Sequence, residues 1–182
     1  PAASYITHCY NTPFDPQVFA REINRILKEV RAEYQWAYET NVKGTTYPVE
    51  YFVFSDVFVC RNCAKEIVFL DAALQKDGSV VEPFNCPHCG AESSKRTLDR
   101  AFVTETDAIT KRPTKRTKTQ LSLVVYCKGK ERITKKAQPE DIALYEKSER
   151  INITDWFPTD RMSDGDEGQR NDPLGLTHVH HF

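Results

Sequence analysis

Two short stretches, Cys60-Arg61-Asn62-Cys63 and Cys86-Pro87-His88-Cys89-Gly90, decide how this chain folds. In each stretch two residues separate the cysteines, so both sulfurs of a tight turn can converge on one ion. The two pairs lie 22 residues apart, slightly more than is usual for such sites, which leaves room for a strand, a turn and a strand. We therefore predict one structural zinc ion per chain, bound by Cys60, Cys63, Cys86 and Cys89, with loss of structure on chelation.

This predicted site is closed. Four protein ligands leave no coordination position for a substrate or water, so the ion should support folding rather than catalysis. Gly90 follows the last ligand, where glycine permits a positive φ. His88 offers an alternative ligand, but the cysteines on either side of it already complete the pair. The alternative to a metal site is four ordinary reduced thiols.

The residues around the two pairs have strand composition. Residues 47–60 are rich in aromatic and β-branched side chains and lead into Cys60. Strands are also expected at 67–70, 80–85 and 98–104, with a turn at Asp77-Gly78. These segments predict a zinc ribbon built from antiparallel hairpins.

An amphipathic helix is expected before the ribbon, at residues 15–39. Asp15 suits the N-cap and Pro16 suits the first helical position. Apolar residues then recur at steps of three and four and form one stripe, which we expect to pack against another element. The stripe contains Phe19, Ile23, Ile26, Val30, Tyr34 and Ala37. A shorter helix is expected at residues 2–6.

After the ribbon, residues 106–119 are polar and basic and predict a linker or an exposed edge. Strand-like residues 121–126, a turn at 127–130 and a proline-initiated helix at 139–148 follow. The predicted fold class is α+β. We expect an N-terminal helical segment (1–46), a zinc-ribbon β domain (47–105), a basic linker with β-hairpin and short helix (106–150), and an acidic irregular segment (151–182).

The net charge of -1 conceals opposite charges along the chain. Residues 111–136 hold ten Lys or Arg against the single Glu131, about +9, whereas residues 139–172 hold ten Asp or Glu against four Lys or Arg, about -6. A basic block of this kind indicates a surface that binds a polyanion. The five candidate phosphate contacts are Lys111, Arg112, Lys115, Arg116 and Lys118; the alternative is a solvated basic loop.

Several classes of protein are disfavoured. No stretch approaches the roughly 18 apolar residues of a membrane span, so we expect no membrane partner and a soluble, cytoplasmic protein. The chain opens at Pro1 and its only methionine is Met162, which predicts a piece of a longer protein. Neither GxGxxG nor GxxxxGK occurs. For Thr177-His178-Val179-His180-His181 we expect a buried or interface strand rather than a metal site, because no Asp or Glu stands at a ligand spacing from it.

Several phrases of the sequence resemble a known family. The matching phrases are residues 1–13 (PAASYITHCYNTP), 36–40 (WAYET), 55–60 (SDVFVC), the second cysteine pair, 156–162 (WFPTDRM) and 177–182 (THVHHF). Together they resemble bacterial and archaeal DNA methylases that modify an exocyclic amino group, N4 of cytosine or N6 of adenine. The resemblance extends over nearly the whole chain.

The resemblance implies S-adenosylmethionine as methyl donor in the full-length parent, and DNA as substrate, with the target base flipped out of the duplex. However, the family's Phe-x-Gly-x-Gly cofactor loop and its Pro-Pro catalytic tetrapeptide are both absent. No catalytic or cofactor-binding residue is therefore assigned. The chain looks like a zinc-bearing insertion between the catalytic motifs, which assists DNA binding or target recognition and has no activity alone.

Two alternatives remain open. The chain could be a zinc-stabilised interaction module that binds the remainder of the methylase chain without touching DNA. The other alternative is a fragment that transfers methyl groups by itself, which its motifs disfavour.

Overall fold

The computed structural model describes residues 2–107, 109–154 and 156–181. Its helical elements are α1 (Ala2–Asn11), α2 (Pro16–Tyr34), η1 (Gln35–Tyr38), α3 (Phe69–Ala73), α4 (Pro139–Ser148), α5 (Asp166–Asn171), η2 (Asp172–Leu174) and η3 (Val179–His181). Its strands are β1 (Glu39–Val42), β2 (Thr45–Val59), β3 (Glu66–Val68), β4 (Phe84–Asn85), β5 (Glu92–Ser93), β6 (Asp99–Arg100), β7 (Phe102–Thr106), β8 (Pro113–Thr117), β9 (Thr119–Lys128) and β10 (Glu131–Lys136). The predicted α+β class, with an N-terminal helix and antiparallel hairpins, is confirmed.

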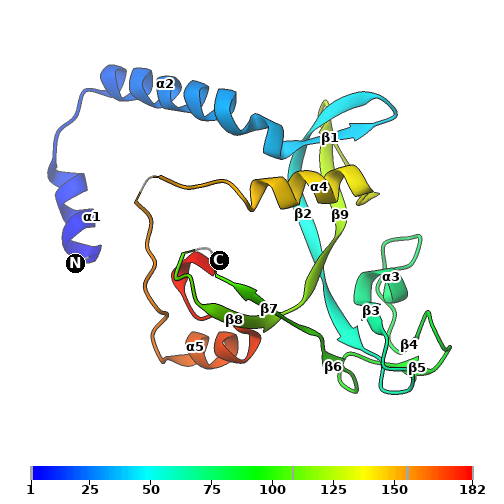
Figure 1. Cartoon of the computed structure of the whole chain (residues 1–182). Coiled ribbons are helices and arrows are strands. Elements are labelled where there is room, and N and C mark those ends of the chain that lie inside the picture. The colour runs from blue at the N-terminus through cyan, green and yellow to red at the C-terminus, as the bar shows by residue number, and fades with distance from the viewer. Residues whose placement is uncertain (1, 108, 155, 182) are drawn as a thin grey trace.

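The long strand β2 organises the molecule (Figure 1). Within the described residues it belongs to a six-stranded sheet of order β1-β2-β9-β10, with β3 and β6 also pairing with β2. Its register with β9 runs antiparallel from Val49↔Tyr126 to Asp56↔Thr119, with irregularities on the way. Segments 47–105 and 106–150, which sequence analysis treated separately, therefore share this sheet.

Two apolar regions lie along β2. Near β1 and β9, the buried side chains include Val49, Val124 and Val125, and the ring of Tyr145 on α4 meets Phe54 at 4.9 Å between centroids. At the other end, a core cluster contains Phe58, Cys60, Ile67, Phe69, Ala73, Phe84, Cys86 and Leu98. One cysteine of each pair, Cys60 and Cys86, therefore belongs to the core of the small module formed by β3, α3, β4 and β5.

Helix α2 begins as predicted but does not pack as predicted. The Asp15 side chain accepts hydrogen bonds from the backbone N–H groups of Gln17 and Val18, and Pro16 is the first helical residue. The helix ends at Tyr34 and continues as the 3-10 helix η1. None of its residues is buried, and Phe19, Ile23, Ile26 and Val30 are exposed, so for this part of the stripe the expectation that it packs on another described element is wrong. Figure 1 shows α2 extending away from the sheet.

Three further expectations about local structure are corrected. The strand expected at 67–70 ends at Val68 and α3 begins at Phe69, because a short apolar run fits a buried strand or a buried helix equally well. The expected strand at 177–181 is instead the 3-10 helix η3 preceded by a single bridge from His178 to Arg161. Part of the segment expected to be irregular, 151–182, forms α5 and η2. Among the described residues, no helix has both the length and the apolar character needed to cross a bilayer.

Candidate metal centre

The two cysteine pairs have the same backbone pattern. In the first, the Cys60 carbonyl accepts from the Ala64 N–H at 2.8 Å, and the Cys60 N–H donates to the Lys65 carbonyl at 2.9 Å. In the second, the Cys86 carbonyl accepts from the Gly90 N–H and the Cys86 N–H donates to the Ala91 carbonyl, both at 2.9 Å. Each turn therefore holds its two sulfurs on the same side.

The residue after each second cysteine has a left-handed backbone. Gly90 has φ of 75°, as its position predicted, and nothing lies within 4 Å of where a Cβ would stand. Ala64 occupies the corresponding place in the first pair with φ of 57°. A non-glycine residue is strained there, because its Cβ crowds the following carbonyl. This strain could not be predicted from the sequence, because alanine is not a turn residue.

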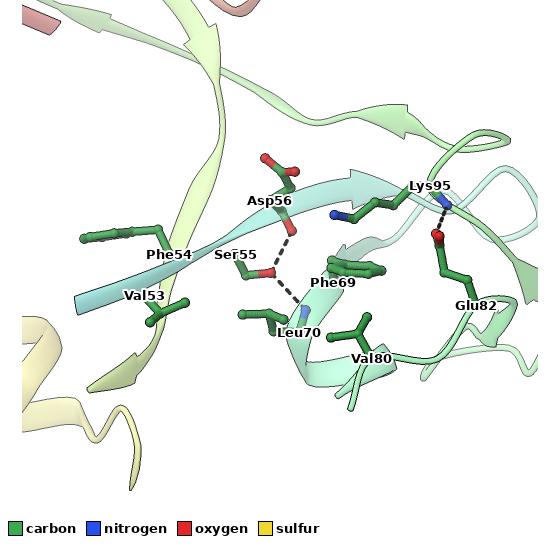
Figure 2. Close-up of a pocket in the computed structure, with 9 residues that line it drawn as sticks. All are labelled: Val53, Phe54, Ser55, Asp56, Phe69, Leu70, Val80, Glu82 and Lys95. Carbon is green, nitrogen blue, oxygen red and sulfur yellow. Dashed lines mark hydrogen bonds between the residues drawn. The ribbon is translucent and has the colours of Figure 1, made fainter. Parts of the chain in front are cut away.

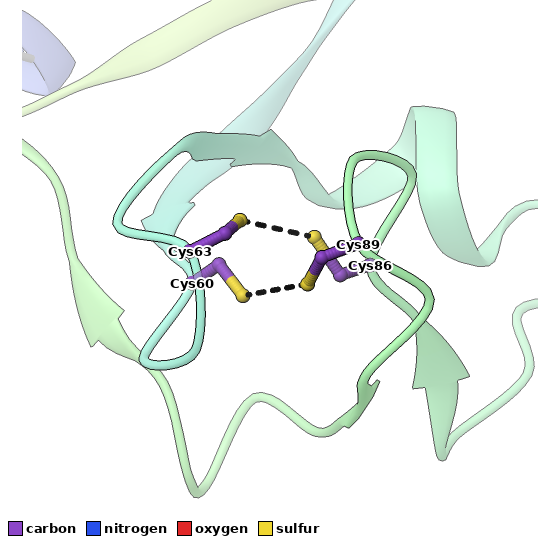
Figure 3. A group of neighbouring side chains, drawn as sticks. All are labelled: Cys60, Cys63, Cys86 and Cys89. Carbon is purple, nitrogen blue, oxygen red and sulfur yellow. Dashed lines mark hydrogen bonds between the residues drawn. The ribbon is translucent and has the colours of Figure 1, made fainter.

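The four sulfurs face one another across a small gap (Figure 3). Cys60 Sγ lies 3.8 Å from Cys89 Sγ, and Cys63 Sγ lies 3.9 Å from Cys86 Sγ. All four lie within 4.8 Å of one another. Sulfurs at 2.3 Å from a tetrahedral ion would be about 3.8 Å apart. The four cysteines therefore form a cluster that could hold a metal ion.

Neighbouring groups orient the sulfurs. The Asn62 side-chain amide donates to Cys89 Sγ at 3.4 Å, and the His88 N–H donates to Cys86 Sγ at 3.4 Å. Such outer contacts fix ligand orientation in metal sites. The His88 ring points elsewhere, with Nε2 2.9 Å from the Glu66 carbonyl oxygen. His88 is thus not placed as a ligand.

The thiols have unequal pKa values. The Asn62 amide lowers the pKa of Cys89 to about 6, and the Cys63 backbone N–H lowers the pKa of Cys60. At Cys63 the Lys65 N–H also lowers the pKa, but burial and the other thiols of the cluster outweigh it and raise the pKa to about 11. Because metals bind the thiolate, an ion entering the cluster at neutral pH must displace a proton from Cys63.

The five basic residues divide into two groups. Lys111 and Arg112 lie in the exposed turn between β7 and β8, and Lys115 is exposed on β8 with Nζ 4.6 Å from the centre of the Phe102 ring. By contrast, Arg116 pairs with Glu105, and Lys118 Nζ lies 2.6 Å from Glu66 Oε2. Two of the five charges are therefore neutralised locally, and Lys111, Arg112 and Lys115 remain the accessible ones.

A pocket of about 460 Å³ lies between β2 and α3 (Figure 2). The Ser55 hydroxyl accepts from the Leu70 N–H at 2.9 Å, and Lys95 Nζ stands 3.9 Å from the centre of the Phe69 ring. The first contact joins α3 to β2, and the second joins α3 to the segment between β5 and β6. No local pattern of the sequence indicates the pocket, because its lining comes from four separate segments, Val53–Asp56, Phe69 and Leu70, Val80 and Glu82, and Lys95.

The histidine tract meets an acidic partner that its sequence neighbourhood does not contain. The Nε2 atoms of His180 and His181 lie 3.0 Å and 2.8 Å from Asp107 Oδ2. More than 70 residues separate these histidines from Asp107, so no ligand spacing could reveal the contact.

Comparisons with protein families, curated proteins and solved structures find no match for the chain.

Proposed function

We propose that the cysteine cluster binds one Zn²⁺ and that the ion has a structural role. Four thiolates at tetrahedral spacing suit zinc, which has no redox chemistry and no geometric preference of its own. Cys60 and Cys86 are 1% and 2% exposed and belong to the apolar cluster with Phe58 and Ile67. Removing the ion would leave four converging thiols at the edge of that core, with Cys60 and Cys86 inside it and Cys89 exposed.

The proposed role of the zinc-bearing chain is to help an S-adenosylmethionine-dependent DNA methylase engage its substrate. The observation that carries this proposal is the exposed basic group Lys111, Arg112 and Lys115 on the β7–β8 hairpin. The resemblance to amino-methylases supports DNA as the polyanion. In this role the chain contacts phosphates, and methyl transfer belongs to the rest of the parent protein.

The hairpin is connected to the zinc module through short links. Ala101 N–H donates to the Val57 carbonyl, and Lys118 N–H donates to the Ala101 carbonyl, both at 2.8 Å. β6, which follows the second cysteine pair, pairs with the end of β2 directly before Cys60. The module formed by β3, α3, β4 and β5 therefore helps to position the first residues of the β7–β8 hairpin. Loss of zinc should unfold this module and so weaken DNA binding.

The test is duplex binding by the full chain, measured by fluorescence anisotropy over a range of salt concentrations. Replacing Lys111 and Arg112 by Gln should weaken binding and reduce the slope of log K against log salt by about 2, since each phosphate contact contributes about 0.9. The matched control replaces Lys128 and Lys130, two exposed lysines at the β9–β10 turn. Equal effects of both pairs, or no detectable duplex binding at low salt, would overturn the proposal.

A second candidate function follows from α2. Its exposed apolar side chains include Phe19, Ile23 and Ile26, at 53%, 38% and 48% exposure. A stripe of this kind is typical of a helix that docks in a groove of a partner. Here the partner would be the remainder of the methylase chain, and the chain would bind it without binding DNA.

Pull-down with the separately expressed remainder distinguishes the two candidates. The docking candidate expects binding that is lost in Ile23→Ser but kept in Lys28→Ser, on the same helix. Isothermal titration with S-adenosylmethionine tests the third possibility, that the chain is active alone. Absence of heat would exclude it.

A further inference from the structure

The carboxylate of Asp107 is fixed by the turn that follows β7. Its Oδ1 atom accepts from the Ile109 N–H at 2.9 Å, the Thr110 N–H at 2.6 Å and the Thr110 hydroxyl at 2.9 Å. The Lys111 N–H closes the turn on the Asp107 carbonyl at 3.0 Å. One carboxylate oxygen is thus fully used by the turn, and Oδ2 is free to face other groups.

The two histidines approach Oδ2 from the 3-10 helix η3. Their side chains are 7% exposed for His180 and 12% for His181, and that of Asp107 is 7% exposed. The turn is closed by the His181 N–H, which donates to the His178 carbonyl at 3.0 Å, while the Val179 N–H donates to the Asp160 carbonyl at 2.9 Å. Two imidazoles and a carboxylate therefore converge in a largely buried place.

The Asp107 carboxylate is contacted from both elements, by Thr110 of its own turn and by His180 and His181 of η3. Two histidines and a carboxylate are a ligand set for divalent first-row transition ions. The carboxylate also has the hydrogen-bonded outer oxygen that ligating carboxylates require.

A second observation concerns the far side of the His180 ring. Its Nδ1 atom is buried and has no hydrogen-bond partner among the described residues. Hydrogen bonding within the cluster therefore leaves one buried ring nitrogen unused, and that nitrogen can carry the ring proton when Nε2 serves as a ligand.

We propose that Asp107, His180 and His181 form a second metal site, distinct from the cysteine cluster, for a divalent transition ion such as Zn²⁺ or Co²⁺. The ligand atoms lie within 4.8 Å of one another. Ligands at about 2.1 Å from one ion, with angles between octahedral and tetrahedral values, are roughly 3.0–3.4 Å apart. The distances of 3.0 Å and 2.8 Å to Oδ2 are close to this range.

The proton positions set the properties of this site. Without an ion, Nε2 of each ring lies within hydrogen-bond distance of Asp107 Oδ2. Ligation through Nε2 requires that the ring proton lies on Nδ1. His180 loses no hydrogen bond at Nδ1, because that atom has no partner among the described residues. His181 Nδ1 accepts the Thr177 N–H at 3.0 Å, and this hydrogen bond must break when Nδ1 carries the proton. The second site is therefore weaker than the thiolate site, and its three protein ligands leave positions open for water.

The ion would join distant parts of the chain. Asp107 begins the turn that carries Lys111 and Arg112, and the histidines end the described C-terminal segment. A bound ion would thus fix the basic turn against η3.

The test is a Co²⁺ titration of the full chain with the cysteine cluster already filled by one equivalent of zinc. The wild-type protein should take up a second equivalent with visible d–d absorption and without thiolate-to-cobalt bands in the near ultraviolet. His180→Ala and Asp107→Asn should lose this uptake or weaken it at least tenfold. The matched control is His178→Ala, which removes the third imidazole of the same tract and should keep the uptake.

Two results would overturn the proposal. One is a wild-type chain that takes up no Co²⁺ beyond the zinc equivalent at millimolar concentration. The other is an equal loss in His178→Ala and His180→Ala, which would show a non-specific histidine tract. If a variant loses its C-terminal fold, paramagnetic shifts of wild-type imidazole resonances decide the matter, since His180 and His181 should shift strongly and the distant His8 should not.

Discussion

Gly175 lies against the backbone of Lys115, so close that a Cβ on the glycine would stand 2.2 Å from the Lys115 carbonyl oxygen. The glycine also has φ of 83°. Close by, the Thr117 hydroxyl donates to the Leu174 carbonyl at 3.4 Å. The C-terminal segment therefore packs directly on the basic strand β8.

Gly175→Ala should detach this segment. The left-handed backbone alone costs about 1 kcal/mol, and the clash with Lys115 adds to it. Gly78→Ala is the matched control, since Gly78 has φ of 84° and open space around its Cβ position. We expect faster proteolysis at residues 156–181 and a larger loss of unfolding free energy for Gly175→Ala. Equal losses of unfolding free energy in Gly175→Ala and Gly78→Ala would contradict the close approach of Gly175 to Lys115.

The ion pair between Lys135 and Asp141 should matter more than its neighbour between Lys136 and Asp71. Asp141 is 3% exposed and accepts from Lys135 at 2.8 Å, while Lys136 and Asp71 are 66% and 35% exposed. Asp141→Asn should cost about 3 kcal/mol in urea unfolding, because it leaves a buried cation unpaired. Asp71→Asn should cost under about 1 kcal/mol. Similar free-energy costs for the two variants would contradict the prediction that the buried ion pair contributes more than the exposed one.

The same aspartate predicts a pH dependence. Burial raises the pKa of Asp141, but the bonds from Lys135, Thr40 and Gln138 outweigh burial and lower it. Because the folded pKa lies below the unfolded value of about 3.9, this stabilisation is present above about pH 4 and disappears as the pH falls further. Unfolding free energy measured from pH 6 to pH 3 should fall less steeply in Asp141→Asn. An unchanged slope would contradict this prediction.

Ala64 and Gly90 should respond to substitution in opposite directions. Ala64→Gly relieves a left-handed alanine and should strengthen zinc binding by about 1 kcal/mol, roughly fivefold. Gly90→Ala introduces the same strain and should weaken binding by a similar amount. Competition with a chromophoric chelator measures both. Changes of the same sign would show that the two turns are not equivalent.

Zinc binding should release protons. At pH 7 the pKa of Cys63, about 11, keeps its thiol protonated, whereas Cys89, with a pKa of about 6, is mostly ionised. Calorimetry in buffers of different ionisation enthalpy should show at least one proton released, and zinc affinity should fall more steeply below pH 6. Cys127→Ser, outside the cluster, should leave the count unchanged. A count of zero would contradict a thiolate site.

Local signals predicted the local parts of the structure. The cysteine spacing located the two turns, and Asp15 with Pro16 located the start of α2, because these features depend on residues within a few positions of one another. The left-handed Gly90 was predictable for the same reason. The exposure of the α2 stripe was not, because amphipathic spacing says which side is apolar and not whether a partner is present.

Long-range contacts were beyond sequence reasoning. No local pattern indicates that β2 pairs with β9 some 70 residues later, or that Asp107 meets His180 and His181. The pairing of Arg116 and Lys118 with Glu105 and Glu66 likewise depends on the sheet register, so the five basic residues could not be ranked by accessibility beforehand.

Zinc K-edge X-ray absorption of the metal-free chain reconstituted with one equivalent of Zn²⁺ measures which atoms bind the ion. We expect that the ion remains bound through desalting and has a first shell of four sulfurs at about 2.3 Å. Retention of less than about half an equivalent, or a first shell containing nitrogen or oxygen, would contradict the closed four-cysteine site.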